Sequence, residues 1–296
     1  MMRAVSMRRG AAVLATLLVT SVAAAACSSS SSSDDKDKAP VGSGKVAVPS
    51  QFKGKLVAPA VVGYPPYAFL EGKDAQGISV DLAKALGGPW GETVTLKNDS
   101  FENALLGINR ETYFGAFGAD VTAEREKVFD QVSFLKDYHS FMTLADADDI
   151  GDSMDSLCGL KIALVAADSS IPVLKEQSAT CTKDGKDAIT VLTFADQGAA
   201  TLAVQSKQAD ATTATVTNLG FIQKKAGNTF KVSGPHYHYV LISVAAKKGN
   251  GMAQALADGI NELIDSGEYT KILKRYGVES TAVERAEVNP DPNVEP

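Results

Sequence analysis

The stretch KIALVAADSSIPVLKEQSATCTKDGKDAITVLTF (residues 161–194) contains the pattern that decides the fold. Its apolar run KIALVA (161–166) predicts a buried strand, SSIPVLKEQSA (169–179) has the apolar spacing of a helix, and AITVLTF (188–194) predicts a second strand. A strand, a helix and a strand in this order are typical of a βαβ unit with parallel strands. We therefore expect an α/β domain here.

The same alternation continues in both directions along the chain. Further strands are predicted at 55–63, 93–97, 112–118, 209–216, 229–234 and 239–246, and helices at 78–87, 100–109, 123–129, 196–208 and 217–227. The segment 251–277 breaks this rhythm, because it is helical throughout except near Gly267. The pattern predicts an α/β architecture with helices on both faces of mainly parallel sheets.

The N-terminus predicts export. Residues 1–26 place three arginines ahead of a short uncharged apolar run that is followed by polar sequence, as in a secretory signal peptide. Cys27 then stands where a bacterial lipoprotein carries its lipid, although Ala24 replaces the usual leucine and ordinary cleavage at A-x-A is the alternative. Residues 27–47 are serine-rich and charged, which predicts a disordered tether. We expect an extracytoplasmic protein anchored to the outer face of the membrane through lipidated Cys27.

Net charge and cysteine content further restrict the class of partner and the expected covalent structure. Removing the signal peptide takes the formal net charge from −6 to −9, which disfavours nucleic acid as a partner. Cys158 and Cys181 remain besides Cys27, and two such cysteines in an exported protein predict a disulfide. A helix at 169–179 that runs back along the strand at 161–166 would bring these two cysteines together.

Catalytic and metal motifs are weak in this sequence. Neither cysteine has a catalytic setting, and the sequence lacks a G-x-S-x-G motif and a phosphate-binding glycine loop. His236 and His238 fall on one face of a predicted strand, with His236 expected near the cleft side of the hinge, but no third ligand is near them in sequence. We expect no enzyme activity, no cofactor and no metal.

Arg125 lies in DVTAEREKVFD (120–130), a few residues after a predicted strand and in the first turn of a short helix. Open α/β sheets bind ligands at the carboxyl ends of their strands, close to helix N-termini. A cation in the first turn opposes the helix dipole, so helix stability does not explain this arginine. It either binds a ligand or is an exposed arginine that pairs with Glu124 or Glu126.

Four segments, at 63–87, 100–108, 120–134 and 247–278, resemble in order and spacing the extracytoplasmic solute-binding proteins, family 3, the amino-acid receptors of ABC importers. The resemblance implies a two-lobed, type II periplasmic-binding-protein-like fold with a ligand cleft between lobes that two hinge crossings join. The implied limits are 48–138 plus 240–278 for lobe 1, 139–239 for lobe 2 and 279–296 for a C-terminal tail. We expect a monomer whose closure over a ligand is recognised by the permease subunits of an ABC transporter.

The resemblance also assigns roles to site residues. Thr122, Glu124 and Arg125 match the family's T-x-E-R motif, whose arginine grips the α-carboxylate of the ligand. Tyr64 and Phe101 stand where two aromatic rings enclose the ligand's side chain, although each could instead be core packing.

Three positions depart from the family pattern. Thr215 stands where members usually have the aspartate that binds the ammonium group, Asp120 replaces a serine or threonine, and Ala167-Asp168-Ser169 replaces G-T-T. Asp120 could accept the hydrogen bonds of the amine or pair with Arg125. Asp168 and Ser169 either contact the ligand or cap the following helix.

Two acids facing one arginine disfavour glutamate and aspartate as ligands. We expect a polar, zwitterionic or basic amino acid, or a derivative whose amine is displaced or alkylated. Capture and delivery to an importer is the function that the sequence favours. A dehydratase-like enzyme on the same fold, with Asp120 as its acid or base, and a sensor without transport are the alternatives.

Overall fold

The computed structural model describes residues 44–293. The expected signal peptide, the lipidation at Cys27 and most of the tether lie outside the described residues. Val46 donates a hydrogen bond to the carbonyl of Pro89 at 3.0 Å, and Lys45 pairs with Glu262 at 2.7 Å. The last residues of the expected tether therefore pack on the globular body. None of the helices in 44–293 combines the length and the apolar character that a membrane span needs.

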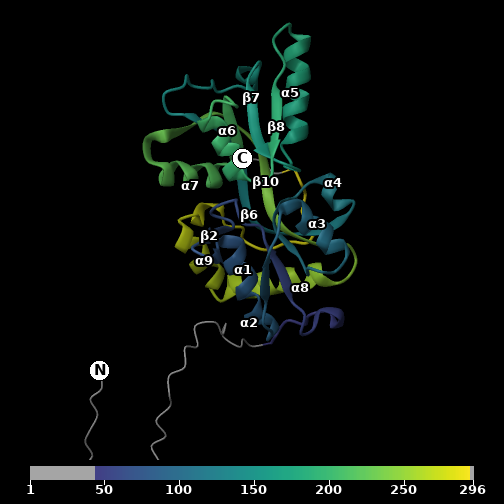
Figure 1. Cartoon of the computed structure of the whole chain (residues 1–296). Coiled ribbons are helices and arrows are strands. Elements are labelled where there is room, and N and C mark those ends of the chain that lie inside the picture. The colour runs from purple at the N-terminus through teal and green to yellow at the C-terminus, as the bar shows by residue number, and fades with distance from the viewer. Residues whose placement is uncertain (1–43, 294–296) are drawn as a thin grey trace, which may run out of the picture. The chain divides into compact units, whose positions relative to one another are not determined.

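A mixed six-stranded sheet runs in the order β5-β10-β6-β9-β7-β8 (Figure 1). Its strands are β5 Ala116–Asp120, β6 Phe129–Leu144, β7 Lys161–Val165, β8 Thr190–Phe194, β9 Ala211–Thr215 and β10 Phe230–Lys247. Strand β7 pairs in parallel with β8 and β9, whereas β6 and β10 are antiparallel to each other and to their outer neighbours. The expectation of mainly parallel sheets was wrong, because the two long strands β6 and β10 run through the sheet in opposite directions.

Strands β6 and β10 are the two crossings of the two-lobed fold. They pair along their whole lengths, from Phe129 opposite Lys247 to Leu144 opposite Phe230. At one end β10 pairs with β5, and at the other end β6 pairs with β9. Figure 1 shows α1, α2, α8 and α9 around one end of this pair and α5, α6 and α7 around the other. The sequence boundaries proposed for the lobes stay a prediction.

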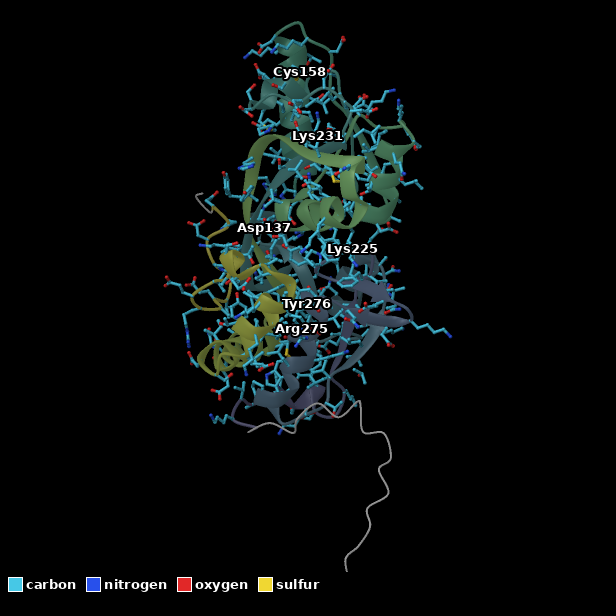
Figure 2. The ribbon with its side chains drawn as sticks, turned by 90° about the vertical axis from the view of Figure 1, so that its left-hand side faces the viewer. Asp137, Cys158, Lys225, Lys231, Arg275 and Tyr276 are labelled. Atoms are coloured by element: carbon cyan, nitrogen blue, oxygen red, sulfur yellow. A yellow bond between two sulfur atoms is a disulfide. The ribbon has the colours of Figure 1, made fainter. Side chains whose placement is uncertain are left out.

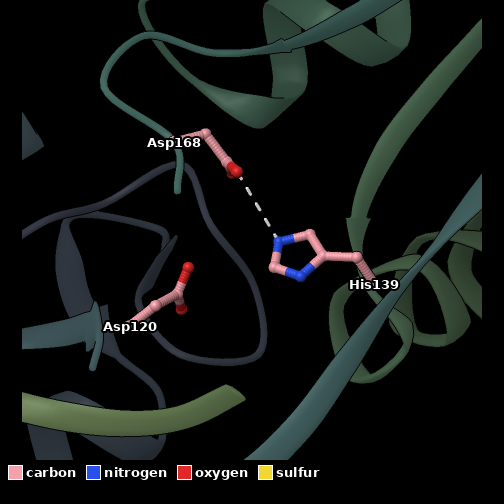
Figure 3. A group of neighbouring side chains, drawn as sticks. All are labelled: Asp120, His139 and Asp168. Carbon is pink, nitrogen blue, oxygen red and sulfur yellow. Dashed lines mark ion pairs between the residues drawn. The ribbon is translucent and has the colours of Figure 1, made fainter. Parts of the chain in front are cut away.

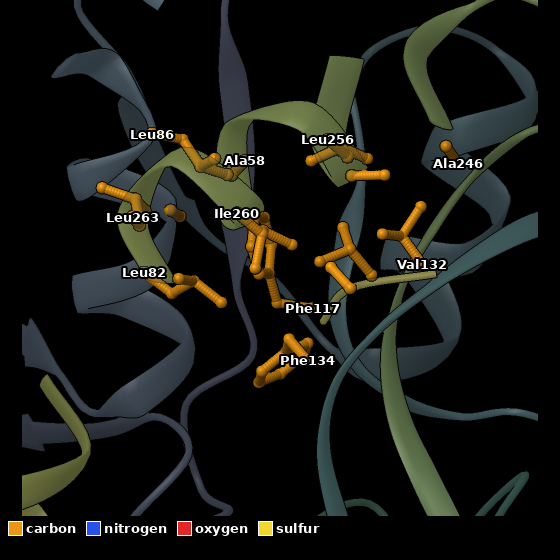
Figure 4. Packing of buried hydrophobic residues seen from close by; sticks show 14 of the residues in the cluster. Ala58, Leu82, Leu86, Phe117, Val132, Phe134, Ala246, Leu256, Ile260 and Leu263 are labelled. Carbon is orange, nitrogen blue, oxygen red and sulfur yellow. The ribbon is translucent and has the colours of Figure 1, made fainter. Parts of the chain in front are cut away.

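Lobe 1 has two small apolar clusters and one large apolar core. It gathers buried side chains such as Phe117, Phe134 and Leu256 (Figure 4). Around it lie β1 Val57–Ala60, β2 Phe69–Glu71, β3 Asp74–Gln76, β4 Thr95–Asn98, α1 Ile78–Ala85, α2 Gly87–Trp90, α3 Phe101–Asn109, α4 Ala123–Glu126, α8 Met252–Asp265 and α9 Glu268–Tyr276. Gly267 separates α8 from α9 with a φ of 76°, which accounts for the interruption expected there. Ala286 of the C-terminal segment also packs into this core.

Lobe 2 is built from β7, β8 and β9 with α5 Ile171–Lys183, α6 Gln197–Gln205 and α7 Val216–Ala226. Buried residues form two clusters, one around Ile162 and Leu174 and the other around Ala163 and Leu219, because successive residues of β7 point to opposite faces. The structure contains the Cys158–Cys181 disulfide, which ties the segment before β7 to the last turn of α5. Figure 2 shows Cys158 well away from Asp137 in the crossing strand β6.

Candidate functional site

A cavity of ≈ 80 Å³ lies between the two lobes. Of the predicted ligand-binding residues, all except Ser169 line it: Tyr64, Phe101, Asp120, Arg125, Asp168 and Thr215. Asp120 ends β5, Thr215 ends β9 and Asp168 follows β7. The cavity therefore occupies the place, beyond the carboxyl ends of strands, where α/β sheets bind ligands.

Arg125 is fixed by main-chain acceptors from both lobes. Its Nη1 donates to the carbonyl of Asp120 at 2.8 Å, and its Nη2 donates to the carbonyl of Ala167 at 2.9 Å. Its guanidinium also lies over the ring of Phe101, 5.4 Å from the ring centroid. Within residues 44–293 no ion pair joins Arg125 to a carboxylate. The alternative of a surface pair with Glu124 or Glu126 was wrong, and the guanidinium keeps further N–H donors for a ligand.

The carboxylate of Asp120 meets the hydroxyl of Ser169 across the cleft. Ser169 Oγ donates to Asp120 Oδ2, and His238 Nε2 lies 2.7 Å from the same hydroxyl. Because the hydroxyl has a single proton, which it gives to Asp120, His238 must donate through Nε2. Burial and the charge of His139 lower the pKa of His238, in agreement with a neutral ring.

Asp168 faces the ring of His139, which lies in β6 (Figure 3). His139 Nε2 is 3.7 Å from Asp168 Oδ1, and that carboxylate also accepts from the backbone N–H and the hydroxyl of Ser170 at 2.8 and 2.6 Å. Burial favours a neutral His139, but the carboxylate of Asp168 outweighs it and raises the pKa of His139 to about 9. Burial likewise opposes ionisation of Asp168, yet His139 and Ser170 hold its pKa well below the ordinary value.

A metal ion is not required to explain this group. Donor atoms of Asp120, His139 and Asp168 all lie within 4.8 Å of one another. His139 could serve as a ligand to a cation only through a deprotonated nitrogen, whereas Asp168 stabilises the protonated ring. We interpret the group as a buried ion pair beside a second carboxylate.

The aromatic residues of the cleft are tied to the protein itself. Tyr64 packs against the cores of both lobes, and its hydroxyl accepts from the backbone N–H of Thr215 at 3.2 Å. Thr215 caps α7 by accepting from the N–H of Asn218. Phe101 lies beneath Arg125. The enclosure of a ligand's side chain by Tyr64 and Phe101 stays a prediction.

The two histidines of β10 do not share a face. The pairing of β10 with β6 shifts on both sides of Tyr237, and His238 has a φ of 49°. His238 therefore enters the cleft, whereas His236 is exposed and lies against Tyr138, with ring centroids 4.5 Å apart. His236 lines a second hollow beside the crossing strands, together with Tyr239 and Arg275, and does not line the ligand cavity. A regular strand register cannot predict the irregularities around Tyr237.

Sequence comparison identifies the family. The profile of the bacterial extracellular solute-binding proteins, family 3, matches residues 58–279. The chain belongs to this family. The arginine-binding protein ArgT of Corynebacterium glutamicum is 27% identical over 246 residues, which cover 81% of this chain and 80% of that protein.

Solved structures share the fold of this family member. An ancestral arginine-binding protein bound to arginine aligns with a TM-score of 0.67 and 20% identity, covering 75% of this chain and 98% of that chain. An ancestral amino acid-binding protein, described as a precursor of cyclohexadienyl dehydratase, aligns with a TM-score of 0.67 and 20% identity over 76% of this chain and 96% of that one. Likeness at this level of identity establishes the two-lobed fold alone.

The sequence analysis missed three residues of the site: Asp196, which lines the cavity, and His139 and His238, which lie beside it. Asp196 lines the cavity and caps α6 by accepting from the N–H of Ala199 at 2.8 Å. Its place as the first residue of the helix predicted at 196–208 was a usable signal for a cap. His139 and His238 carry no local signal, because their partners come from segments distant in the chain.

Proposed function

We propose that this solute-binding protein captures an amino acid with a cationic side chain, of the arginine class. The proposal rests on the balance of charges in the cleft. Three carboxylates, of Asp120, Asp168 and Asp196, line the cavity with the single guanidinium of Arg125, and His139 adds one positive charge behind it. One negative charge stays uncompensated, and a basic amino acid, with its net positive charge, neutralises it.

The α-carboxylate and the α-ammonium group of the ligand have separate partners in this proposal. Arg125 binds the α-carboxylate, since its guanidinium is held in place by two carbonyls and has donors to spare. Asp120 binds the α-ammonium group in place of the aspartate that the family usually has at the position of Thr215. The side chain then extends along Tyr64 and toward Asp196, which both line the cavity.

Delivery to an importer follows from membership of the family and is part of the proposal. The protein would be anchored outside the cell membrane through lipidated Cys27 and would present the closed, ligand-bound form to the permease subunits of an ABC transporter. The relative in Corynebacterium glutamicum, an arginine-binding protein, supports the choice of ligand class.

Calorimetric titration of the mature protein with L-arginine, L-lysine, L-citrulline and L-glutamate tests the ligand class. Citrulline is the informative control, because it has nearly the shape of arginine without its side-chain charge. We expect arginine and lysine to bind at least tenfold more tightly than citrulline, and glutamate to bind weakest. Citrulline binding as tightly as arginine, or no binding by the basic amino acids, would refute the proposal.

The same samples distinguish capture from catalysis. A binding protein returns each ligand unchanged after incubation, whereas a dehydratase-like enzyme would release water from a bound carboxylic acid. Mass spectrometry of the incubated ligands would detect a dehydrated product directly, and we expect none.

A further inference from the structure

Both ring nitrogens of His139 face acceptors. The residue is 1% exposed. Its Nδ1 lies 3.4 Å from the carbonyl oxygen of His238, which can only accept, so Nδ1 carries a proton. Its Nε2 lies 3.7 Å from Asp168 Oδ1, and a proton on Nε2 is favoured there too. The surroundings therefore select the doubly protonated, positively charged ring.

Asp168 and Asp120, two of the three carboxylates that line the cavity, differ in what compensates their negative charge. Asp168 has a cation, His139, and two further donors from Ser170. Asp120 is 8% exposed, and within residues 44–293 its carboxylate receives a hydrogen bond only from the neutral hydroxyl of Ser169. His139 lies within 4.8 Å of this carboxylate but does not bond it, so a ligand ammonium group in direct contact would stabilise the buried Asp120 further.

Building on the proposed function, we infer that His139 sets the charge of the cleft and thereby the ligand charge that it selects. The imidazolium neutralises Asp168 and leaves Asp120 as the carboxylate that meets the ammonium group of the ligand. His139 does not line the cavity, so it is a positioning residue and acts through Asp168.

The surroundings of His139 keep this charge in place at neutral pH. Titratable groups reach it from β5, from its own strand β6, from the loop after β7 and from β10: Asp120, Asp137, Asp168, Tyr237 and His238. Three of these are carboxylates, and together they raise the pKa of His139 to about 9 against the opposing effect of burial. His139 therefore keeps its positive charge at neutral pH and up to about pH 8.

His139→Gln tests the inference, with selectivity as the readout. The variant adds one negative charge to the cleft, so we expect the ratio of arginine affinity to citrulline affinity to rise about tenfold. Both ligands have the same α-amino and α-carboxyl groups, so the ratio reports the side-chain charge alone. The double variant His139→Gln/Asp168→Asn restores the original charge and should return the ratio to its wild-type value. His236→Gln, an exposed histidine outside the cleft, should leave it unchanged.

An unchanged ratio in His139→Gln, or a double variant that keeps the single variant's ratio, would overturn the inference. Nitrogen NMR of the unmodified protein provides a test that depends neither on folding of a variant nor on the ligand. The sequence has 3 histidines, so their ring signals are readily assigned. We expect an imidazolium at His139 at pH 7 and a neutral, Nε2-protonated ring at His238. A neutral His139 would overturn the inference even if arginine binds, whereas a wild type that binds neither amino acid would refute only the proposed function.

Discussion

The carboxylate of Asp120 faces the cleft, and within residues 44–293 the hydroxyl of Ser169 is its only hydrogen-bond donor. We predict that Asp120→Asn weakens arginine binding by about 2 to 4 kcal/mol, because the ammonium group loses its charged partner. The desamino analogue of arginine, which lacks that group, should bind both proteins about equally. Calorimetry with the two ligands measures this, and Glu124→Gln, on the exposed surface of α4, is the control. If Asp120→Asn weakened the binding of both ligands equally, Asp120 would not be the partner of the ammonium group.

Ala167 has a φ of 64°, a left-handed conformation that costs a residue with a Cβ about 1 kcal/mol. Glycine at this position would remove the strain. It would also make the unfolded chain more flexible, which offsets part of the gain in stability. We predict that Ala167→Gly raises the free energy of unfolding by about 0.5 kcal/mol. Ala179→Gly, on the exposed side of helix α5, should instead lower it by about 1 kcal/mol. Urea denaturation measures both, and a less stable Ala167→Gly variant would contradict the prediction.

The ion pair of His139 makes stability depend on pH. The folded protein raises the pKa of His139 from 6.5 to about 9. A raised pKa means that the stabilisation is fully present below pH 6.5 and is lost as the pH rises through 9. It amounts to about 3 kcal/mol. Denaturation at a series of pH values should show this loss in wild type and in His236→Gln but not in His139→Gln. The same slope in all three proteins would exclude His139 as its source.

The sequence predicted part of this site and could not have predicted the rest. Arg125, Asp120 and Asp168 were found because they lie in or beside segments with a recognisable pattern. The roles of His139 and His238 were missed because they depend on neighbours far away in the chain. The bulges around Tyr237 turn His238 inward, and regular strand alternation cannot predict them.

Most helices and short strands were predicted to within a few residues, whereas β2, β3, α2 and the long strand β6 were missed. Polar residues such as Gln131, Asp137 and His139 interrupt its apolar pattern. They are tolerated because hydrogen bonds across the sheet and the cleft satisfy them, for example from Tyr67 Oη to Asp137 Oδ2 at 2.8 Å. A strand that crosses between lobes lacks the periodicity of a strand that serves one core.

The disulfide between Cys158 and Cys181 stabilises one element pair, the start of β7 with the end of α5. It closes a loop with a sequence separation of 23 residues. We predict that the Cys158→Ser/Cys181→Ser variant loses about 3 kcal/mol of unfolding free energy, on the chain-entropy model. Because neither cysteine lines the cavity, arginine affinity should be unchanged. Denaturation and calorimetry of the variant test the two parts, and a large loss of affinity would mean that the disulfide also shapes the cleft.

At the scale of the whole molecule, four hydrogen bonds join the lobes across the cleft within residues 44–293. Ser169 bonds Asp120, Arg125 bonds the carbonyl of Ala167, Thr215 bonds Tyr64, and Asn218 bonds the carbonyl of Pro65. We expect these hydrogen bonds to break when the ligand-free lobes move apart by bending of β6 and β10. We predict a smaller radius of gyration by small-angle X-ray scattering when arginine saturates the protein. An unchanged radius would contradict ligand-driven closure.

Arginine and agmatine differ only by the α-carboxylate, so together they test directly whether the cleft grips an amino acid through Arg125. Calorimetric titration of both ligands into wild type and Arg125→Ala is the decisive measurement. We predict that wild type binds arginine more tightly than agmatine by about 2 to 5 kcal/mol and that Arg125→Ala abolishes this difference. A preference for arginine that survives in Arg125→Ala, or wild-type protein that binds agmatine as tightly as arginine, would contradict the carboxylate-binding role of Arg125.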